Sequence, residues 1–189
     1  MAELFKSSGP GVLITHSNSG QYGWATAMAE PELIKAIVAY EPGAVVFPEG
    51  EIPGEIPSDH PALKEAYQPR TVPLPEFKKL TQMPIMIIYG DYIPREPFEV
   101  FDADLWRLAS LRAGQFVEAV NRHGGDARLI MLPDIGLKGN SHFPFADLNN
   151  NEIADHLEGF LRDKKLDGRD APHQGPKKQA LELTVPLKE

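Results

Sequence analysis

The chain contains no cysteine among its 189 residues. This absence excludes disulfides, thiolate zinc sites and a cysteine nucleophile. Long apolar runs are also missing, and no stretch approaches the roughly 20 residues that a membrane-spanning helix needs. Residues 1–6 lack the apolar core of a signal peptide, so the sequence predicts a cytoplasmic protein by default.

Positive charge is scarce, because 19 Lys and Arg residues stand against 27 Asp and Glu, giving a net charge of -8. This balance argues against nucleic acid or an anionic membrane surface as the partner. The histidines are not paired at metal-ligand spacing, and residues 9–11 lack the full dinucleotide-binding spacing. We therefore expect neither a metal nor a cofactor.

Short apolar runs alternate with longer amphipathic segments, a pattern that predicts an α/β fold with a parallel sheet flanked by helices. The length favours one domain, which we place at residues 1–166. Strands are expected at 12–15, 36–40, 84–89 and 127–132, and the main helices at 21–29, 103–123 and 151–165.

Residues 42–75 contain eight prolines and little periodicity. This segment is too long for an ordinary connector, so we interpret it as a lid-like insertion that covers a site, with an irregular surface loop as the alternative. Residues 167–189 are polar and contain prolines, which predicts an extended or disordered tail.

The segment GVLITHSNSG at 11–20 ends an apolar, β-branched run in a serine among small residues. A serine on a tight strand-to-helix turn is typical of a nucleophile elbow, in which its hydroxyl projects above the sheet. The usual glycines two residues before and after Ser17 are replaced by Thr15 and Ser19. The alternative is an ordinary junction in which Ser17 caps the following helix.

A serine nucleophile needs a base, and His142 lies in a loop after the last expected strand. Parallel sheets carry their functional groups in loops at the carboxyl ends of strands, so His142 is well placed. His16 is expected to point away from Ser17, into the packing around the turn. The remaining histidines are less suitably placed: His60, His123, His156 and His173.

Two acids follow expected strands and could orient the imidazole. Glu41 comes directly after residues 36–40, and Asp91 follows the strand at 84–89. Generic topology favours Asp91, but spacing alone does not decide between the two.

Three segments together resemble a known family. Residues 15–20 are THSNSG, 41–43 are EPG and 139–142 are GNSH. In this order they are similar to a bacterial and fungal esterase group of the α/β-hydrolase superfamily, and the resemblance extends over about residues 9–161, the C-terminal half of such a fold.

The resemblance implies a serine hydrolase that acts on small-molecule carboxylic esters. Ser17 would be the nucleophile, His142 the base and Glu41 the acid, with Asp91 as the alternative acid. The backbone N–H of Asn18 would form one half of the oxyanion hole.

The sequence departs from this family in one respect, since the early strands and the second oxyanion donor that they supply are absent from it. We therefore expect the strand before Ser17 to form an open sheet edge, which favours a homo-oligomer or a completing partner chain. The alternative function is a truncated, non-catalytic binding protein or a partner-completed subunit. Five aromatic residues could line an acyl pocket or belong to the core: Phe47, Phe77, Trp106, Phe143 and Phe145.

Overall fold

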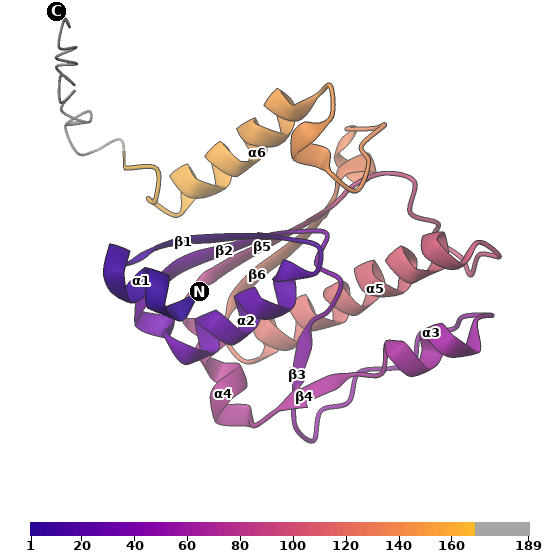
Figure 1. The fold of residues 1–189 in the computed structure, drawn as a ribbon, viewed down its shortest axis with the longest axis horizontal. Coiled ribbons are helices and arrows are strands. Elements are labelled where there is room, and N and C mark those ends of the chain that lie inside the picture. The colour runs from indigo at the N-terminus through magenta and orange to yellow at the C-terminus, as the bar shows by residue number, and fades with distance from the viewer. Residues whose placement is uncertain (169–189) are drawn as a thin grey trace, which may run out of the picture.

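The fold is built on a four-stranded parallel sheet with the strand order β1-β2-β5-β6. The structure is a computed structural model and describes residues 1–168. The strands are β1 (Gly11–His16), β2 (Ile34–Tyr40), β5 (Pro84–Tyr89) and β6 (Asp126–Met131). The α/β class with a parallel sheet flanked by helices is thereby confirmed, and each strand lies within two residues of its predicted bounds (Figure 1).

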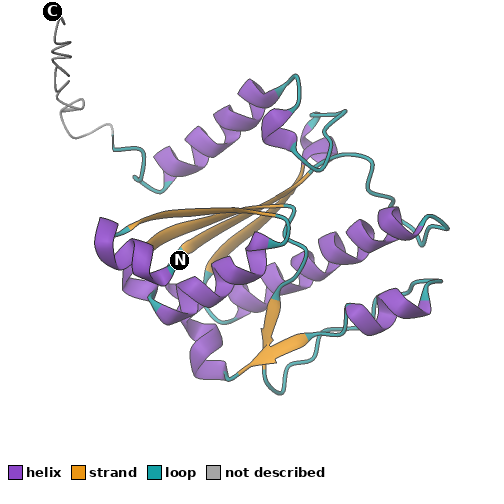
Figure 2. Cartoon of the chain, in the orientation of Figure 1, coloured by secondary structure: helices purple, strands orange, loops and turns teal. Residues whose placement is uncertain are grey.

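Helices cover both faces of this sheet, as Figure 2 shows. The helices α1 (Ala2–Ser8), α2 (Ser19–Ala29), α4 (Leu74–Lys79) and α5 (Phe101–Arg122) lie on one face, and α6 (Asn150–Asp163) lies on the other. The larger core includes Trp24 and Phe116, whereas Phe160 anchors the smaller core under α6. Burial on both faces explains why β2 and β5 are almost wholly apolar.

The proline-rich segment 42–75 forms more regular structure than its composition indicates. It contains β3 (Val46–Pro48), α3 (Pro61–Ala66) and β4 (Arg70–Val72), and β3 pairs with β4 as a separate parallel ladder. These elements lie beside α5, on the side away from α6 (Figure 1). Short 3₁₀ turns complete the chain at Pro31–Leu33, Leu80–Gln82, Leu132–Ile135 and Pro144–Ala146.

A buried polar network fastens the 42–75 segment to α5. The Asp104 side chain is fully buried, pairs with Arg107 at 2.5 Å and accepts a hydrogen bond from the Ser58 hydroxyl at 2.5 Å. Arg107 also donates to the carbonyl of Pro57 at 2.5 Å. Both charged residues belong to α5, so the bonds from Ser58 and to Pro57 are the ones that join the segment to the helix, and breaking them would leave buried polar groups without partners. Whether the segment acts as a lid stays a prediction.

The carboxyl ends of the strands lie together at one end of the main sheet. The last paired residues include His16 with Tyr40 and Tyr40 with Ile88, so the loops that follow β1, β2 and β5 emerge side by side. Within the described range β1 pairs only with β2 and lies at the margin of the sheet. No helix in residues 1–168 combines the length and apolarity needed to cross a membrane. The predicted tail lies outside the described residues except for 167 and 168.

Candidate active site

Ser17 directly follows β1 on a strained turn. Its φ is +54°, in the left-handed region that non-glycine residues rarely adopt and that costs about 1–3 kcal/mol. Asn18, not Ser17, stands at the N-cap of α2, so the capping interpretation of Ser17 is wrong. Tight packing leaves no room for a side chain at Gly20, whose Cβ would lie 2.7 Å from the Cβ of Pro42.

Glu41 follows β2 and is similarly constrained, with a φ of +43°. Its side chain is only 3% exposed. One carboxylate oxygen accepts a hydrogen bond from the backbone N–H of Gly90 at 2.6 Å, the first residue after β5. Beside it, the buried hydroxyl of Tyr89 donates to the carbonyl of Pro42 at 2.6 Å, and burial holds the pKa of Tyr89 well above its usual range.

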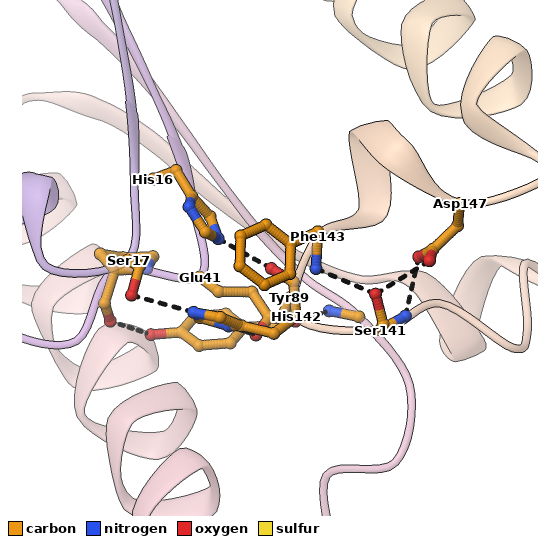
Figure 3. Close-up of polar contacts among 10 residues, drawn as sticks. His16, Ser17, Glu41, Tyr89, Ser141, His142, Phe143 and Asp147 are labelled. Carbon is orange, nitrogen blue, oxygen red and sulfur yellow. Dashed lines mark hydrogen bonds and ion pairs between the residues drawn. The ribbon is translucent and has the colours of Figure 1, made fainter.

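His142 lies between Glu41 and Ser17 and contacts both (Figure 3). Its Nδ1 is 2.5 Å from Glu41 Oε2, and its Nε2 is 2.9 Å from Ser17 Oγ. A carboxylate only accepts hydrogen bonds, so Nδ1 carries the proton and Nε2 accepts from the serine hydroxyl. The structure thus brings Ser17, His142 and Glu41 into one hydrogen-bonded chain.

Polar side chains near the start of α6 hold the His142 loop. The Asp147 carboxylate accepts from the backbone N–H and the hydroxyl of Ser141, each at 2.8 Å (Figure 3). Asn140 is fully buried and exchanges two amide hydrogen bonds with Asn149, at 2.7 and 3.0 Å. Sequence reasoning missed both Asp147 and Asn149. The only signal was the polar run at 149–152, which directly follows Leu148.

His16 also supports this loop, a contact that the sequence did not predict. Its Nε2 donates to the backbone carbonyl of His142 at 2.8 Å, and the centroids of the two imidazole rings are 4.6 Å apart. Phe143 and Phe145 pack against the His16 ring at 4.8 and 5.1 Å. Trp106, from α5, lies 4.1 Å from the His142 ring.

Asp91, the alternative acid, directs its carboxylate to backbone amides. It accepts hydrogen bonds from the N–H of Gly139 and of Tyr92, both at 2.9 Å. These two bonds hold the pKa of Asp91 below its usual value. The carboxylate therefore supports the loop that carries His142, whereas Glu41 contacts the imidazole itself.

A cavity of about 240 Å³ opens beside the serine. It is lined by Ser17, Asn18, Gln21, Gly43, Ala44, Tyr67, Arg70 and Trp106. Of the aromatic residues proposed for an acyl pocket, only Trp106 borders this cavity, and Phe77 is buried in the core. Across residues 1–168, no group of three or more His, Asp or Glu side chains is arranged to hold a metal ion.

Comparison with known proteins finds similarity to lipases and esterases. No family model matches the sequence. A protein described as the probable secreted lipase phiG, from Fungal sp. (strain ATCC 74256), is 29% identical over 180 residues, covering 80% of this chain and 46% of the lipase. A solved structure of a novel bacterial esterase is 29% identical with a TM-score of 0.65, covering 86% of this chain and 41% of the esterase. The chain thus spans less than half the length of either protein.

Proposed function

Because the chain is related to esterases and lipases of the α/β-hydrolase type, we propose that it hydrolyses small-molecule carboxylic esters through an acyl-enzyme on Ser17. The observation that supports this proposal best is the hydrogen-bonded chain from Glu41 through His142 to the serine hydroxyl. A nucleophile, a base within hydrogen-bond reach and an acid that orients the base are the parts that acyl transfer requires.

The proposed reaction proceeds in two steps. Ser17 Oγ attacks the ester carbonyl while His142 Nε2 takes the hydroxyl proton, and the imidazolium is stabilised by the buried Glu41 carboxylate. His142 then gives this proton to the departing alkoxide, which leaves as the alcohol. In the second step His142 activates a water molecule, whose attack releases the carboxylic acid and restores the serine.

Asn18 is the proposed oxyanion donor through its backbone N–H. It follows the nucleophile and stands at the N-terminus of α2, where free amides and the helix dipole favour negative charge. A donor of this kind typically contributes about a hundredfold or more to the rate.

Covalent labelling tests the proposal directly. A fluorophosphonate probe should attach to Ser17. The variant Ser17→Ala should not be labelled, and its turnover of 4-nitrophenyl butyrate should fall by at least about 1,000-fold. Ser7→Ala, which removes an exposed hydroxyl in α1, is the matched control and should keep both. Undiminished turnover in Ser17→Ala would contradict the mechanism, and a folded wild type that resists the probe would favour the non-catalytic alternative. Pairing of another chain with β1 and a cytoplasmic location stay predictions.

A further inference from the structure

The cavity beside Ser17 adjoins a second cavity of about 210 Å³ that no proposed step uses. Four residues line both of them: Gly43, Ala44, Tyr67 and Arg70. The second cavity extends from Arg70, at the start of β4, to Arg112 on α5. Its remaining lining is mostly apolar or neutral, and it includes Phe47 and Ala109.

Two arginines without carboxylate partners flank this second cavity. No Asp or Glu is among the residues that line either cavity. In residues 1–168, neither Arg70 nor Arg112 forms an ion pair, although acidic residues outnumber basic ones in the chain. Two positive charges therefore border one cavity without an acidic partner, in a protein whose net charge is -8.

Arg112 is buried with only neutral oxygens around it. Its side chain donates to Gly54 O at 3.1 Å, to Gln115 Oε1 at 2.7 Å and to Tyr67 O at 3.2 Å. The residue is 8% exposed, its Nε is buried without a hydrogen-bond partner, and burial lowers its pKa. A buried charge is costly unless an opposite charge compensates it, and an unmatched buried N–H adds to that cost.

Arg70 connects the second cavity to the serine. Its Nη1 donates to Gln21 Oε1 at 3.0 Å, and Gln21 Nε2 donates to Asn18 Oδ1 at 2.5 Å. These bonds link the guanidinium to the residue that follows Ser17, and they leave most of its five N–H groups available. The side chain is exposed enough for a ligand to reach it.

We propose that the cavity between Arg70 and Arg112 binds a carboxylate of the substrate, so that the chain prefers esters that carry a second, ionised carboxyl group. A carboxylate would supply the missing counter-charge, and its two oxygens fit the planar guanidinium fork. The volume suits a carboxylate with a short alkyl chain, while the ester group lies at Ser17. This inference rests on the proposed function, because it names the substrate class of the same site.

Matched esters test the preference. The mono-4-nitrophenyl esters of adipate and suberate carry a free carboxylate, and their ω-methyl esters are neutral controls of similar length. The wild type should show a kcat/KM at least about tenfold higher for the acids, and 0.5 M NaCl should reduce this advantage by screening. In Arg70→Gln the ratio of kcat/KM for the acids to kcat/KM for the neutral esters should fall to about one. Equal kcat/KM for charged and neutral esters in the wild type would overturn the proposal.

Further variants separate charge from structure. Arg70→Lys should retain part of the preference, because it keeps the charge but loses the fork. Arg162→Gln removes an exposed arginine of α6 and should leave the preference unchanged. Arg112→Lys, checked for folding by circular dichroism, should weaken the preference in the same direction as Arg70→Gln. If Arg70→Gln loses activity equally on charged and neutral esters, Arg70 has a general structural role and the proposal is wrong.

Isothermal titration calorimetry tests the anion site by binding alone, without ester turnover. Adipate should bind to Ser17→Ala and should bind at least about tenfold more weakly when Arg70→Gln is added. If no ester is hydrolysed by the wild type, the proposed function fails, and this measurement still decides whether the anion site exists. Absence of adipate binding in both proteins would overturn the anion site alone.

Discussion

Replacing Gly90 by alanine is the sharpest test of how the site is held together. A Cβ at this position would lie 2.8 Å from Glu41 Oε1, 2.8 Å from Ser141 O and 2.9 Å from Asn140 O. Ordinary carbon–oxygen contact begins near 3.4 Å, so each oxygen must move by about half an ångström. Gly90 has no positive φ, and the expected effect is therefore purely steric.

All three oxygens belong to groups that position His142. Glu41 accepts from the Gly90 N–H and contacts the imidazole, while Asn140 and Ser141 precede His142 in its loop. A misplacement of about 1 Å in a catalytic site can cost about a hundredfold in rate, so a half-ångström shift should lower kcat by about 10- to 100-fold. Inserting a methyl group into this packed region should also cost about 1–3 kcal/mol in the free energy of unfolding.

The assay is the kcat for 4-nitrophenyl butyrate together with urea unfolding. Gly114→Ala is the matched control, because a Cβ there meets Leu129 at 3.7 Å within the helix α5. Alanine is favoured over glycine inside a helix by about 0.5–1 kcal/mol, so this control should gain stability and keep its kcat. If Gly90→Ala showed wild-type kcat and wild-type stability, the close contact between Gly90 and Glu41 would not matter to the site.

Two other predictions concern the support of the His142 loop. His16→Phe keeps a ring but loses the N–H that bonds the His142 carbonyl, so kcat for 4-nitrophenyl butyrate should fall by up to about tenfold. His16→Gln, which keeps a donor, should recover part of this loss, and equal kcat in the two variants would contradict the role. Asp91 has a lowered pKa in the folded state, so its ionised carboxylate stabilises the fold above the ordinary value of 3.8, and this contribution is lost as the pH falls through the lower folded pKa. The urea midpoint of the wild type should therefore exceed that of Asp91→Asn at pH 6 and approach it below pH 4, whereas a gap that does not change with pH would refute the linkage.

The strands of the main sheet could be predicted because local pattern determines them. Each is a short apolar run bounded by polar or turn residues, and β2 and β5 are buried on both faces. The structure within 42–75 was not predicted, since β3 and β4 have three residues each and their pairing joins distant segments. Prolines also obscure any periodicity in this region.

The supporting residues of the site could not be predicted, because their partners lie in other segments. Asp147 and Asn149 act on residues six to nine positions earlier, across a loop whose path is set by tertiary packing. The choice between Glu41 and Asp91 was open for the same reason. Both follow neighbouring strands of one sheet, and only the backbone after each strand decides which carboxylate meets the imidazole.

The backbone at Ser17 and Glu41 is held by hydrogen bonds that continue the pairing of the strands by one residue. The N–H of Ser17 donates to Tyr40 O at 2.9 Å, and the N–H of Glu41 donates to Ile88 O at 2.8 Å. Both residues therefore stay hydrogen-bonded to the neighbouring strand while adopting a strained positive φ. These hydrogen bonds hold the strained backbone in place, so Ser17 and Glu41 are positioned by the ladder of the main sheet.

The residues that line the cavity between Arg70 and Arg112 are held by contacts outside the main sheet. Arg70 belongs to the 42–75 segment, which is fastened to α5 by the buried Asp104 network and by the hydrogen bonds of Arg112. Residues proposed for chemistry are thus held by the sheet, and residues proposed for selecting the substrate are held by a separate attachment. The segment 42–75 also contacts the serine turn, since the N–H of Gly43 donates to Ser17 O at 3.3 Å and Arg70 donates to Gln21. The side-chain hydrogen bonds from Ser17 through His142 to Glu41 include no residue of the segment, so a substitution on its surface can alter the cavity wall while those hydrogen bonds stay.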